Sequence, residues 1–483
     1  MPLRRFAQAL IVACLAAGIA LPHPAAALQL GFNDGESFQY GLRPDQRAIA
    51  LAHARIAGAS LIRLNVNWDD VDVLPPLGSA QARDPNWVGY HWGSLDSQVH
   101  AVIEAGLQPL VVADGLQSVP GWFEGPGRPE PSDAARPGTW RPSAAAFGDF
   151  GHALAARYSG SWVDGGAVLP RVRYFQAYNE PNLPEYLSPQ WVGTTPASPE
   201  VYRAMLNSFY DGVKGVHPDD VVVSAALAPY GDPPVGRRLP PLYFARRLLC
   251  VDGDVQLHAR RCPRVKFDVF AYNAYPFEDP RLPPGIRDNV RLRAGDYQRV
   301  LSLAAAAGTI TTRQAQSIWV TELGWDVEPA FDPPPWKPVT PEIQARYLAT
   351  ALALLWRDHV GAVFWFNLRD YEAITNFTTG SGLFRWSPDV RTDQPKPSYT
   401  AFRFPLTGLL SGHRTDVWGR APAPGPVVLE RGYRSGAWRR LATLRAGRDL
   451  VFTGEERLPL KAQLRAVQGA ATSLTWSVER LAP

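Results

Sequence analysis

Short apolar segments alternate with helix-like segments along most of this chain, and this alternation restricts the possible folds more than any other feature. Eight segments have the pattern of strands, over residues 28–31, 60–67, 108–113, 172–178, 221–226, 267–272, 317–321 and 362–366. Helical patterns lie between them, for example at 45–57, 95–105, 144–158, 201–213, 290–307 and 341–356. Strands that alternate with helices favour parallel βαβ units, so the sequence predicts an α/β fold.

Eight such units over residues 28–408 predict a (β/α)8 TIM barrel with enlarged loops. We expect each strand except the last to be followed by a helix, and the last strand to lead into a proline-rich segment. A doubly wound parallel sheet is the alternative architecture. No glycine-rich phosphate-binding turn follows the first strand, which disfavours that alternative.

The pattern changes near Leu409. Residues 409–483 contain short apolar alternations split by Gly and Pro, which predict a small all-β, sandwich-like module. This segment holds 12 Lys and Arg against 6 Asp and Glu, a net charge of +6, whereas residues 28–408 carry 35 basic and 39 acidic residues, or −4. Such a module is able to attract an anionic polymer, although arginines that only solvate a sheet surface are the simpler interpretation.

The first 27 residues have the pattern of a secretory signal peptide. Arg4 and Arg5 precede an apolar run, and three alanines stand before Leu28. An uncleaved membrane anchor is the alternative, but a span needs about 20 apolar residues. No later stretch is long and apolar enough. We therefore expect a secreted or extracytoplasmic protein, without stable membrane insertion and monomeric by default.

Removal of the leader leaves Cys250 and Cys262 as the cysteines of the mature chain. An even pair in an exported protein predicts a disulfide, and two free buried thiols are the alternative. The histidines are scattered without the spacing of metal ligands, and no Gly-x-Ser-x-Gly segment or basic, aromatic-interleaved stripe occurs. We therefore expect no metal, no cofactor and no nucleic-acid partner.

Two of the predicted strands end in a glutamate. Glu180 follows the fourth strand in Asn179-Glu180-Pro181, and Glu322 ends the seventh strand in Thr321-Glu322-Leu323-Gly324. The loops at the carboxyl ends of barrel strands form the active face of this fold. One such glutamate is often structural, whereas two on strands four and seven point to a shared site.

These two segments resemble the catalytic segments of clan A glycoside hydrolases, with most likeness to families 5 and 39. The resemblance covers roughly residues 29–404. It implies a retaining mechanism, with Glu180 as acid/base and Glu322 as nucleophile. Retention requires carboxyl groups about 5–5.5 Å apart, and opposed strands of a small barrel are able to provide this spacing. The implied activity is cofactor-free hydrolysis of β-glycosidic bonds in a poly- or oligosaccharide.

Four further positions match the clan less closely. Arg63 is expected beside Glu322, where its charge would keep the carboxylate ionised, and the alternative is a structural ion pair. Asn179 is expected to bind the sugar 2-hydroxyl, or else to be a turn residue. Tyr275 matches a tyrosine that contacts the nucleophile, and Trp365 matches a tryptophan that forms the floor of the sugar site. Core packing is the alternative for both aromatic residues.

Two departures from the clan leave the subfamily open. Asn273 stands where members often have a histidine, two residues before the tyrosine after strand six. The third strand ends in Val112-Ala113-Asp114, where family 5 members often have a histidine. Both departures disfavour a cellulase of the usual type.

The predicted loops are rich in aromatic residues. Ten lie at or beyond strand ends: Trp68, Trp87, Tyr90, Trp92, Trp122, Trp140, Tyr186, Trp191, Trp325 and Trp336. Together they favour a saccharide groove and endo action, with exo action on a short glycoside as the alternative. A carbohydrate-binding barrel without turnover and a transglycosylase that remodels a cell-envelope glycan are the other functional alternatives.

Overall fold

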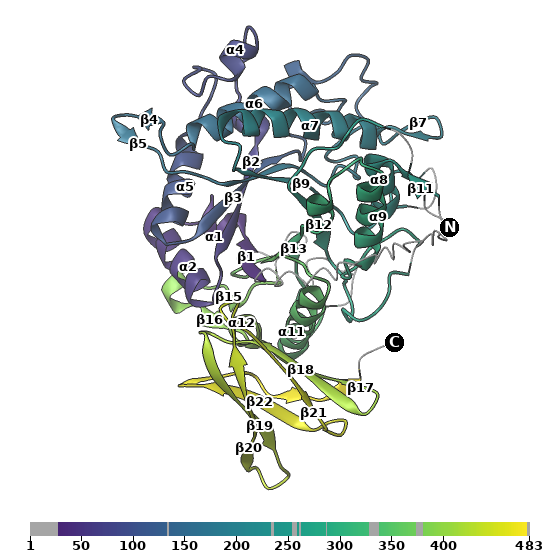
Figure 1. Ribbon diagram of the computed structural model, residues 1–483. Helices are drawn as coiled ribbons and strands as arrows, with labels where there is room; N and C mark the ends of the chain where they lie inside the picture. The colour runs from purple at the N-terminus through teal and green to yellow at the C-terminus, as the bar shows by residue number, and fades with distance from the viewer. Residues whose placement is uncertain are drawn as a thin grey trace, which may run out of the picture.

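The computed structural model describes residues 28–480, apart from 133–134, 233–235, 254–257, 260–261, 286, 328–337 and 373–379. The expected leader lies outside these residues. Eight parallel strands close into a barrel in chain order (Figure 1). They are β1 (Gln29–Asn33), β2 (Leu61–Asn67), β3 (Gln108–Asp114), β6 (Tyr174–Asn179), β9 (Val221–Leu227), β12 (Val269–Ala274), β13 (Ile318–Leu323) and β14 (Ala362–Trp365). The expected TIM barrel is confirmed.

Helices surround this barrel (Figure 1). The longer ones are α2 (Pro44–Ile56), α5 (Gly93–Glu104), α6 (Ala144–Arg157), α7 (Ser198–Val216), α8 (Pro241–Leu249), α9 (Gly295–Ala306) and α11 (Pro341–Arg357). Proline stands in the first turn of α2, α7, α8 and α11, where its missing N–H costs no hydrogen bond. The eighth strand is also followed by a helix, α12 (Pro397–Arg403), so the expectation of a helix-free exit segment was wrong. A proline in the first turn starts this helix too.

Shorter elements lie in the loops. The short helices are α1 (Gly35–Phe38), α3 (Trp68–Val71), α4 (Ser79–Ala82), α10 (Thr312–Ala315), η1 (Gly121–Phe123) and η2 (Val390–Thr392). The short strand pairs are β4 (Val163–Asp164) with β5 (Ala167–Val168), β7 (Trp191–Val192) with β8 (Thr195–Pro196), β10 (Val251–Asp252) with β11 (His258–Ala259), and β15 (Phe384–Arg385) with β16 (Gln394–Pro395). A disulfide joins Cys250, at the end of α8, to Cys262, with Cα atoms 6.2 Å apart, as the sequence predicts.

Alternate residues of each strand fill the inside of the barrel, because strand side chains point to opposite faces in turn. Leu110 and Val112 of β3 belong to the inner cluster with Phe364 of β14, while Val111 packs outward against the helices. Gly31 lies beside this inner cluster, and a Cβ atom there would stand 2.6 Å from the Phe364 ring. The interior is therefore a packed core that closes the base of the site.

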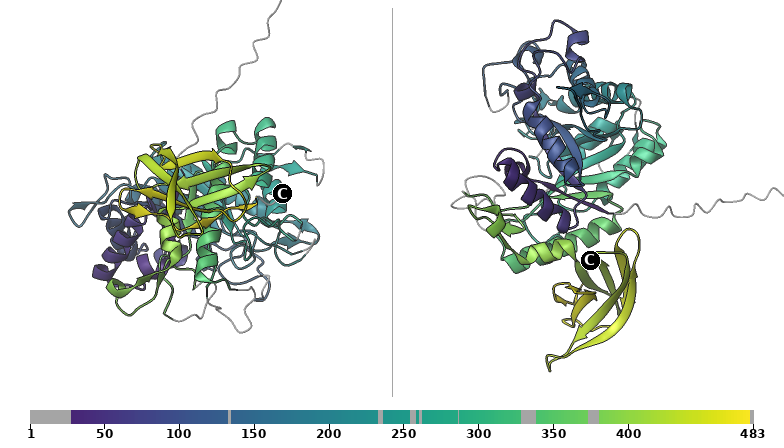
Figure 2. Two further views of the ribbon diagram at one scale, coloured as in Figure 1. Left: turned by 90° about the horizontal axis from the view of Figure 1, so that it is seen from below. Right: turned by 90° about the vertical axis from the view of Figure 1, so that its left-hand side faces the viewer.

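The C-terminal part of the chain is a β-rich module that lies against one side of the barrel (Figure 2). One sheet has the order β21-β18-β17-β25, and the other contains β20, β19, β22, β23 and β24. Their bounds are β17 (Leu406–Ser411), β18 (Arg414–Arg420), β19 (Gly425–Gly432), β20 (Trp438–Ala446), β21 (Val451–Glu456), β22 (Gln463–Gln468), β23 (Ala471–Thr472), β24 (Trp476–Ser477) and β25 (Glu479–Arg480). β17 thus begins slightly before the boundary expected at Leu409.

The module has an apolar core of its own and also packs against the barrel. Trp418 of β18 is buried within the barrel's cluster, and its ring lies 6.2 Å from that of Trp356 on α11. Arg281 binds the Glu479 carboxylate at 2.7 Å, and Arg420 donates to the carbonyl of Gly58 at 3.3 Å. Among the described residues, no helix has the length and apolarity that a membrane span requires.

Candidate active site

A polar cavity of about 750 Å³ opens at the carboxyl ends of the barrel strands. This is the end of the fold where the βα loops meet. Seven of the eight strands contribute residues, most of them at or just past the strand ends, and the loops after β3, β6 and β9 complete the wall. The lining includes Asn33, Arg63, Asn65, Asp114, Asn179, Glu180, Tyr186, Tyr230, Tyr275, Glu322 and Phe366.

Glu322 of β13 is held at both carboxylate oxygens. Arg63 Nη1 of β2 donates to Oε1 at 2.6 Å, and the Tyr275 hydroxyl donates to Oε2 at 2.7 Å. Arg63 is 1% exposed, and its Nε donates to Gln176 Oε1 at 3.1 Å. The contacts expected of Arg63 and Tyr275 are therefore present, and a buried guanidinium offsets the negative charge of the Glu322 carboxylate.

Glu180 stands directly after β6, in backbone that few side chains adopt. Its φ is +41°, and that of Tyr178 is +79°, both in the left-handed region. Tyr178 is locked by its hydroxyl, which donates to the carbonyl of Tyr186 at 2.6 Å. Its ring packs over Gly115, where a Cβ atom would stand 2.1 Å away. Strained backbone that is held in place by surrounding contacts is common where a side chain points into a functional site.

The environment of Glu180 favours the protonated carboxyl. Burial, together with the negative charge of Glu322, raises the pKa of Glu180 to about 8. Asn273 Nδ2 donates to Glu180 Oε1 at 2.8 Å and opposes this shift. Thr321 fixes that amide by donating to Asn273 Oδ1 at 3.0 Å. At neutral pH the cavity therefore holds a protonated Glu180 and a Glu322 carboxylate that is bound to the Arg63 guanidinium.

The rest of the floor offers unused hydrogen-bonding atoms. Asn179, 4% exposed, has a buried Oδ1 without a hydrogen-bond partner among the described residues, and so does Asn65. Asp114 accepts from the backbone N–H of Gly115 at 2.6 Å, and burial raises its pKa. Buried polar atoms are usually paired, so this floor is suited to a ligand rich in hydroxyl groups.

Trp365 is not part of the cavity wall. Its side chain is fully buried, its Nε1 donates to the carbonyl of Ser381 at 2.9 Å, and its ring packs 6.0 Å from that of Trp325. The next residue, Phe366, lines the cavity instead. The structure therefore supports the core-packing alternative for Trp365, because its indole is buried in contacts with Ser381 and Trp325.

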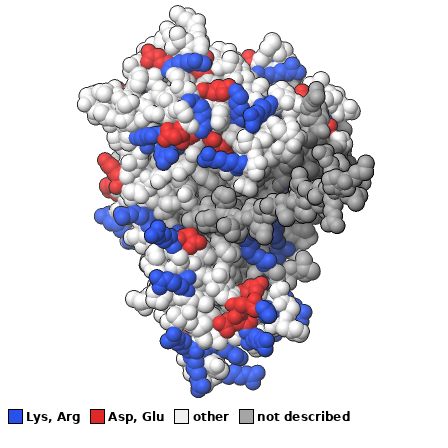
Figure 3. Space-filling model, viewed as in Figure 1, with Lys and Arg blue, Asp and Glu red and all other residues white. Residues whose placement is uncertain are grey.

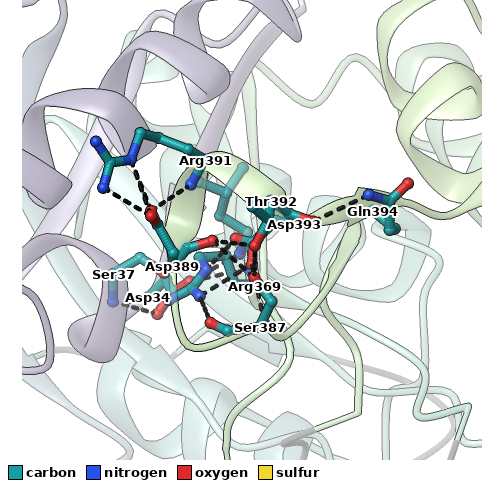
Figure 4. Close-up of polar contacts among 10 residues, drawn as sticks. Asp34, Ser37, Arg369, Ser387, Asp389, Arg391, Thr392, Asp393 and Gln394 are labelled. Atoms are coloured by element: carbon teal, nitrogen blue, oxygen red, sulfur yellow. Dashed lines mark hydrogen bonds and ion pairs between the residues drawn. The ribbon is translucent and has the colours of Figure 1, made fainter.

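The loop that carries Phe366 is anchored by buried charges (Figure 4). Asp34 Oδ2 accepts from the backbone N–H groups of Leu368 and Arg369 at 3.0 and 3.2 Å. The Arg369 guanidinium in turn pairs with Asp393, and both side chains are almost completely buried. The end of β1 is thereby tied to the loop after β14, beside Phe366 in the cavity wall.

The loop aromatics do not form the expected groove. Of the ten, Tyr186 alone is among the described residues that line the cavity, and Trp336 lies outside the described residues. Trp68 is fully buried and stacks on Phe123 with ring centroids 5.1 Å apart. The aromatic side chains mostly build the interior of long loops, so the expectation of an aromatic saccharide groove finds no support.

Sequence reasoning missed two residues that shape the site. Gln176 is a polar residue inside an apolar strand, and it links Arg63 to the carbonyl of Ser224. A polar residue at an inward-facing strand position was the sequence signal that could have identified it. Asn273 was noted only as a departure from a family pattern. In the part of the chain that the structure describes, no cluster of His, Cys, Asp and Glu has the arrangement of a metal site.

No protein-family model matches the sequence, and no curated protein matches it significantly. Solved structures do match. A glucosidase from Croceicoccus marinus is 13% identical, with a TM-score of 0.46 over 90% of this chain and 93% of that chain. A GH5_18 protein from Streptomyces cattleya in complex with GlcNAc is 16% identical, with a TM-score of 0.49 over 79% and 80%. A β-glucuronidase from Bacteroides uniformis is 12% identical, with a TM-score of 0.45, and this chain covers 46% of its length. At these identities the likeness extends to the overall fold alone.

Proposed function

We propose that this protein is a retaining glycoside hydrolase that cleaves β-glycosidic bonds. The supporting observation is the pair Glu180 and Glu322, which face one polar cavity in opposite electrostatic environments. Retaining enzymes need one carboxylic acid and one carboxylate flanking the glycosidic bond. Environments that separate two titrating groups in this way assign the acid and the nucleophile.

In the first step the Glu322 carboxylate attacks the anomeric carbon and the bond to the leaving oxygen breaks. Glu180 gives its proton to that oxygen, which leaves a glycosyl-enzyme ester on Glu322. In the second step the Glu180 carboxylate takes a proton from water, and this water displaces Glu322 from the sugar. The β configuration is retained because two inversions occur. Asn179 is positioned to bind a sugar hydroxyl, and Arg63 is positioned to orient Glu322.

The limited volume of the cavity favours exo action over the endo action that the aromatic loops predicted. A cavity of about 750 Å³ lies within the range of small-ligand sites. Its lining combines amides and carboxyls with the aromatic side chains of Tyr186, Tyr230, Tyr275 and Phe366. We therefore expect the enzyme to prefer a short glycoside or a terminal sugar of a chain.

We also infer that the protein is exported, from the signal-peptide pattern of residues 1–27 and the Cys250–Cys262 disulfide. Disulfides persist in oxidising compartments. A glycosidase there would meet extracellular or cell-envelope saccharides.

A panel of aryl β-glycosides and β-linked oligosaccharides tests the proposed reaction. We expect the mature protein to release sugar from at least one substrate, and Glu322→Gln to lose turnover by several orders of magnitude. Glu278→Gln is the matched control, because Glu278 is exposed and outside the cavity. Products larger than the substrate would assign transglycosylation, and glycan binding without any product would assign the binding barrel.

A further inference from the structure

The five-stranded sheet of the C-terminal module carries a basic surface that the proposed reaction does not use. Residues 425–446 and 463–477 contain six arginines and one acidic residue, Glu430. None of them lines the cavity. In Figure 3 the end of the molecule where Figure 1 draws β19 and β20 is covered by basic side chains.

The strand register places three of these arginines on the outward face of the sheet. Arg440 of β20 and Arg465 of β22 are both paired with Glu430 of β19, and Arg445 is paired with Pro426. Paired residues lie on the same face of a sheet. The residues between these positions, such as Leu429, point into the module core. We call this outward side the arginine face.

Acidic residues neutralise only one of the three arginines of the arginine face. Arg465 binds Glu430 at 2.6 Å and lies over the Trp438 ring at 4.4 Å. Arg440 and Arg445 are exposed, and no carboxylate lies within ion-pair distance of either among the described residues. Arg440 and Arg445 therefore present charge without internal compensation, on the same face as a partly exposed indole.

The end of the β19–β20 hairpin repeats this arrangement on the other side of the sheet. Arg431 and Arg439 stand directly opposite each other across the two strands, and both guanidinium groups lie 5.3 Å from the Tyr433 ring centroid. Like charges in directly opposed positions destabilise a strand pair. An anion bound here would relieve that repulsion.

We propose that the arginine face and the adjoining hairpin end bind an anionic polysaccharide. Guanidinium groups bind carboxylate and sulfate oxygens in paired hydrogen bonds. Indole and phenol rings stack on the apolar faces of sugar rings, and a flat sheet face accepts an extended chain. A glycan is favoured over other polyanions because the same chain carries a proposed saccharide-cleaving cavity, and this choice of polymer rests on the proposed function.

Binding of labelled polygalacturonate by the full mature chain tests the proposal. The Glu322→Gln background prevents cleavage during the measurement. We expect affinity that falls steeply as salt rises. The triple variant Arg439→Thr/Arg440→Thr/Arg445→Thr should bind at least roughly tenfold more weakly, since each lost arginine removes one contact to the polyanion. Threonine suits exposed strand positions.

Two controls separate this surface from net charge. The variant Arg55→Gln/Arg313→Gln/Arg357→Gln removes three exposed charges from barrel helices and should leave binding unchanged. Fully methyl-esterified pectin, which has the same backbone without the charge, should bind far more weakly than polygalacturonate. Dextran sulfate, which carries sulfate without carboxylate and is offered in parallel, shows whether sulfate serves as well as carboxylate.

Equal binding by the two triple variants would overturn the proposal. So would absence of binding to both acidic polymers, or a clear preference for double-stranded DNA or anionic lipid vesicles over them. Activity of the triple variant on a small aryl glycoside should remain at the wild-type level. Because binding and turnover are measured separately, failure of this surface and failure of the proposed reaction give different results.

Discussion

At the scale of single residues, the proposed reaction depends on the contrast between two glutamates, and Asn273 adjusts that contrast. Asn273 is the one described side chain that donates a hydrogen bond to the Glu180 carboxyl, and this contact favours the ionised form. Arg63 and Tyr275 act on Glu322 in the same direct way. The pH range of activity should therefore depend on the contacts that Asn273 makes with Glu180 and that Arg63 and Tyr275 make with Glu322.

Activity should fall as pH rises through about 8, because Glu180 must be protonated to act as the acid. Asn273→Ala removes a donor to the carboxylate and should raise the pKa of Glu180, so the alkaline limb of kcat/KM should move to higher pH. Thr321→Ser keeps the hydroxyl that orients Asn273 and should leave the limb in place. A limb that moved to lower pH in Asn273→Ala would contradict the assignment.

A second residue-scale prediction concerns stability. Asp72 is 1% exposed, its Oδ2 accepts from Trp68 Nε1 at 3.2 Å, and burial raises its pKa to about 7. A raised pKa means that the stability contributed by the protonated group is present below about pH 4 and is lost as pH rises through 7. The free energy of unfolding of Asp72→Asn, taken relative to that of the wild type, should therefore be higher at pH 8 than at pH 4.5, by of order 3 kcal/mol. Thermal unfolding at both pH values measures this gain, and an equal difference at the two pH values would contradict it.

The sequence predicted the residues of the site that follow from strand position and family pattern. Glu180, Glu322, Arg63, Asn179 and Tyr275 all lie at the cavity, because residues at strand ends converge whatever the loops do. Trp365 could not be placed in this way. A strand-end aromatic turns inward or outward according to the loop that packs on it, and that loop has no periodic signal.

At the scale of elements, the barrel strands were predictable because each is a short apolar run that must be buried on both faces. The connections were not. Helix α12 follows a long, proline-rich stretch, and its local signal is the proline in its first turn. Within that stretch, the tertiary pair Arg369–Asp393 has no signature in the sequence. The same pair fixes the loop that brings Phe366 to the cavity.

Arg369→Leu should destabilise the protein by about 3–5 kcal/mol, because it leaves the buried Asp393 carboxylate without its partner. The double variant Arg369→Leu/Asp393→Asn should recover a large part of that loss, since no unpaired charge remains. Chemical denaturation of the three proteins measures the difference. Equal stability of the single and double variants would show that the buried charge is not the cause.

At the scale of the whole molecule, barrel and module form one packed unit. Trp418 of the module is part of the barrel's apolar cluster, and Glu479 near the chain end is bound by Arg281 and Arg346 of the barrel. The change in composition near Leu409 predicted a second module, but side-chain packing across the boundary has no signature in a single sequence.

Trp418→Ala should lower the stability of the entire chain by about 3–5 kcal/mol, the usual cost of emptying a buried aromatic site. We expect one cooperative unfolding transition that moves as a whole. Trp438→Ala is the matched control, because Trp438 lies on the outer face of the module and is only half-buried. Differential scanning calorimetry that resolved two transitions, with the barrel transition unmoved in Trp418→Ala, would contradict this coupling of module and barrel.

The most direct test of the central claim is to trap the glycosyl-enzyme. In Glu180→Gln, an activated aryl β-glycoside from the panel should still react with Glu322, because a good leaving group needs no proton, whereas hydrolysis of the ester should be slow. Intact-mass and peptide mass spectrometry should then find one glycosyl unit on Glu322, and added azide should release a β-glycosyl azide. Steady turnover in Glu322→Gln, or a product of inverted configuration from the wild type, would contradict the account.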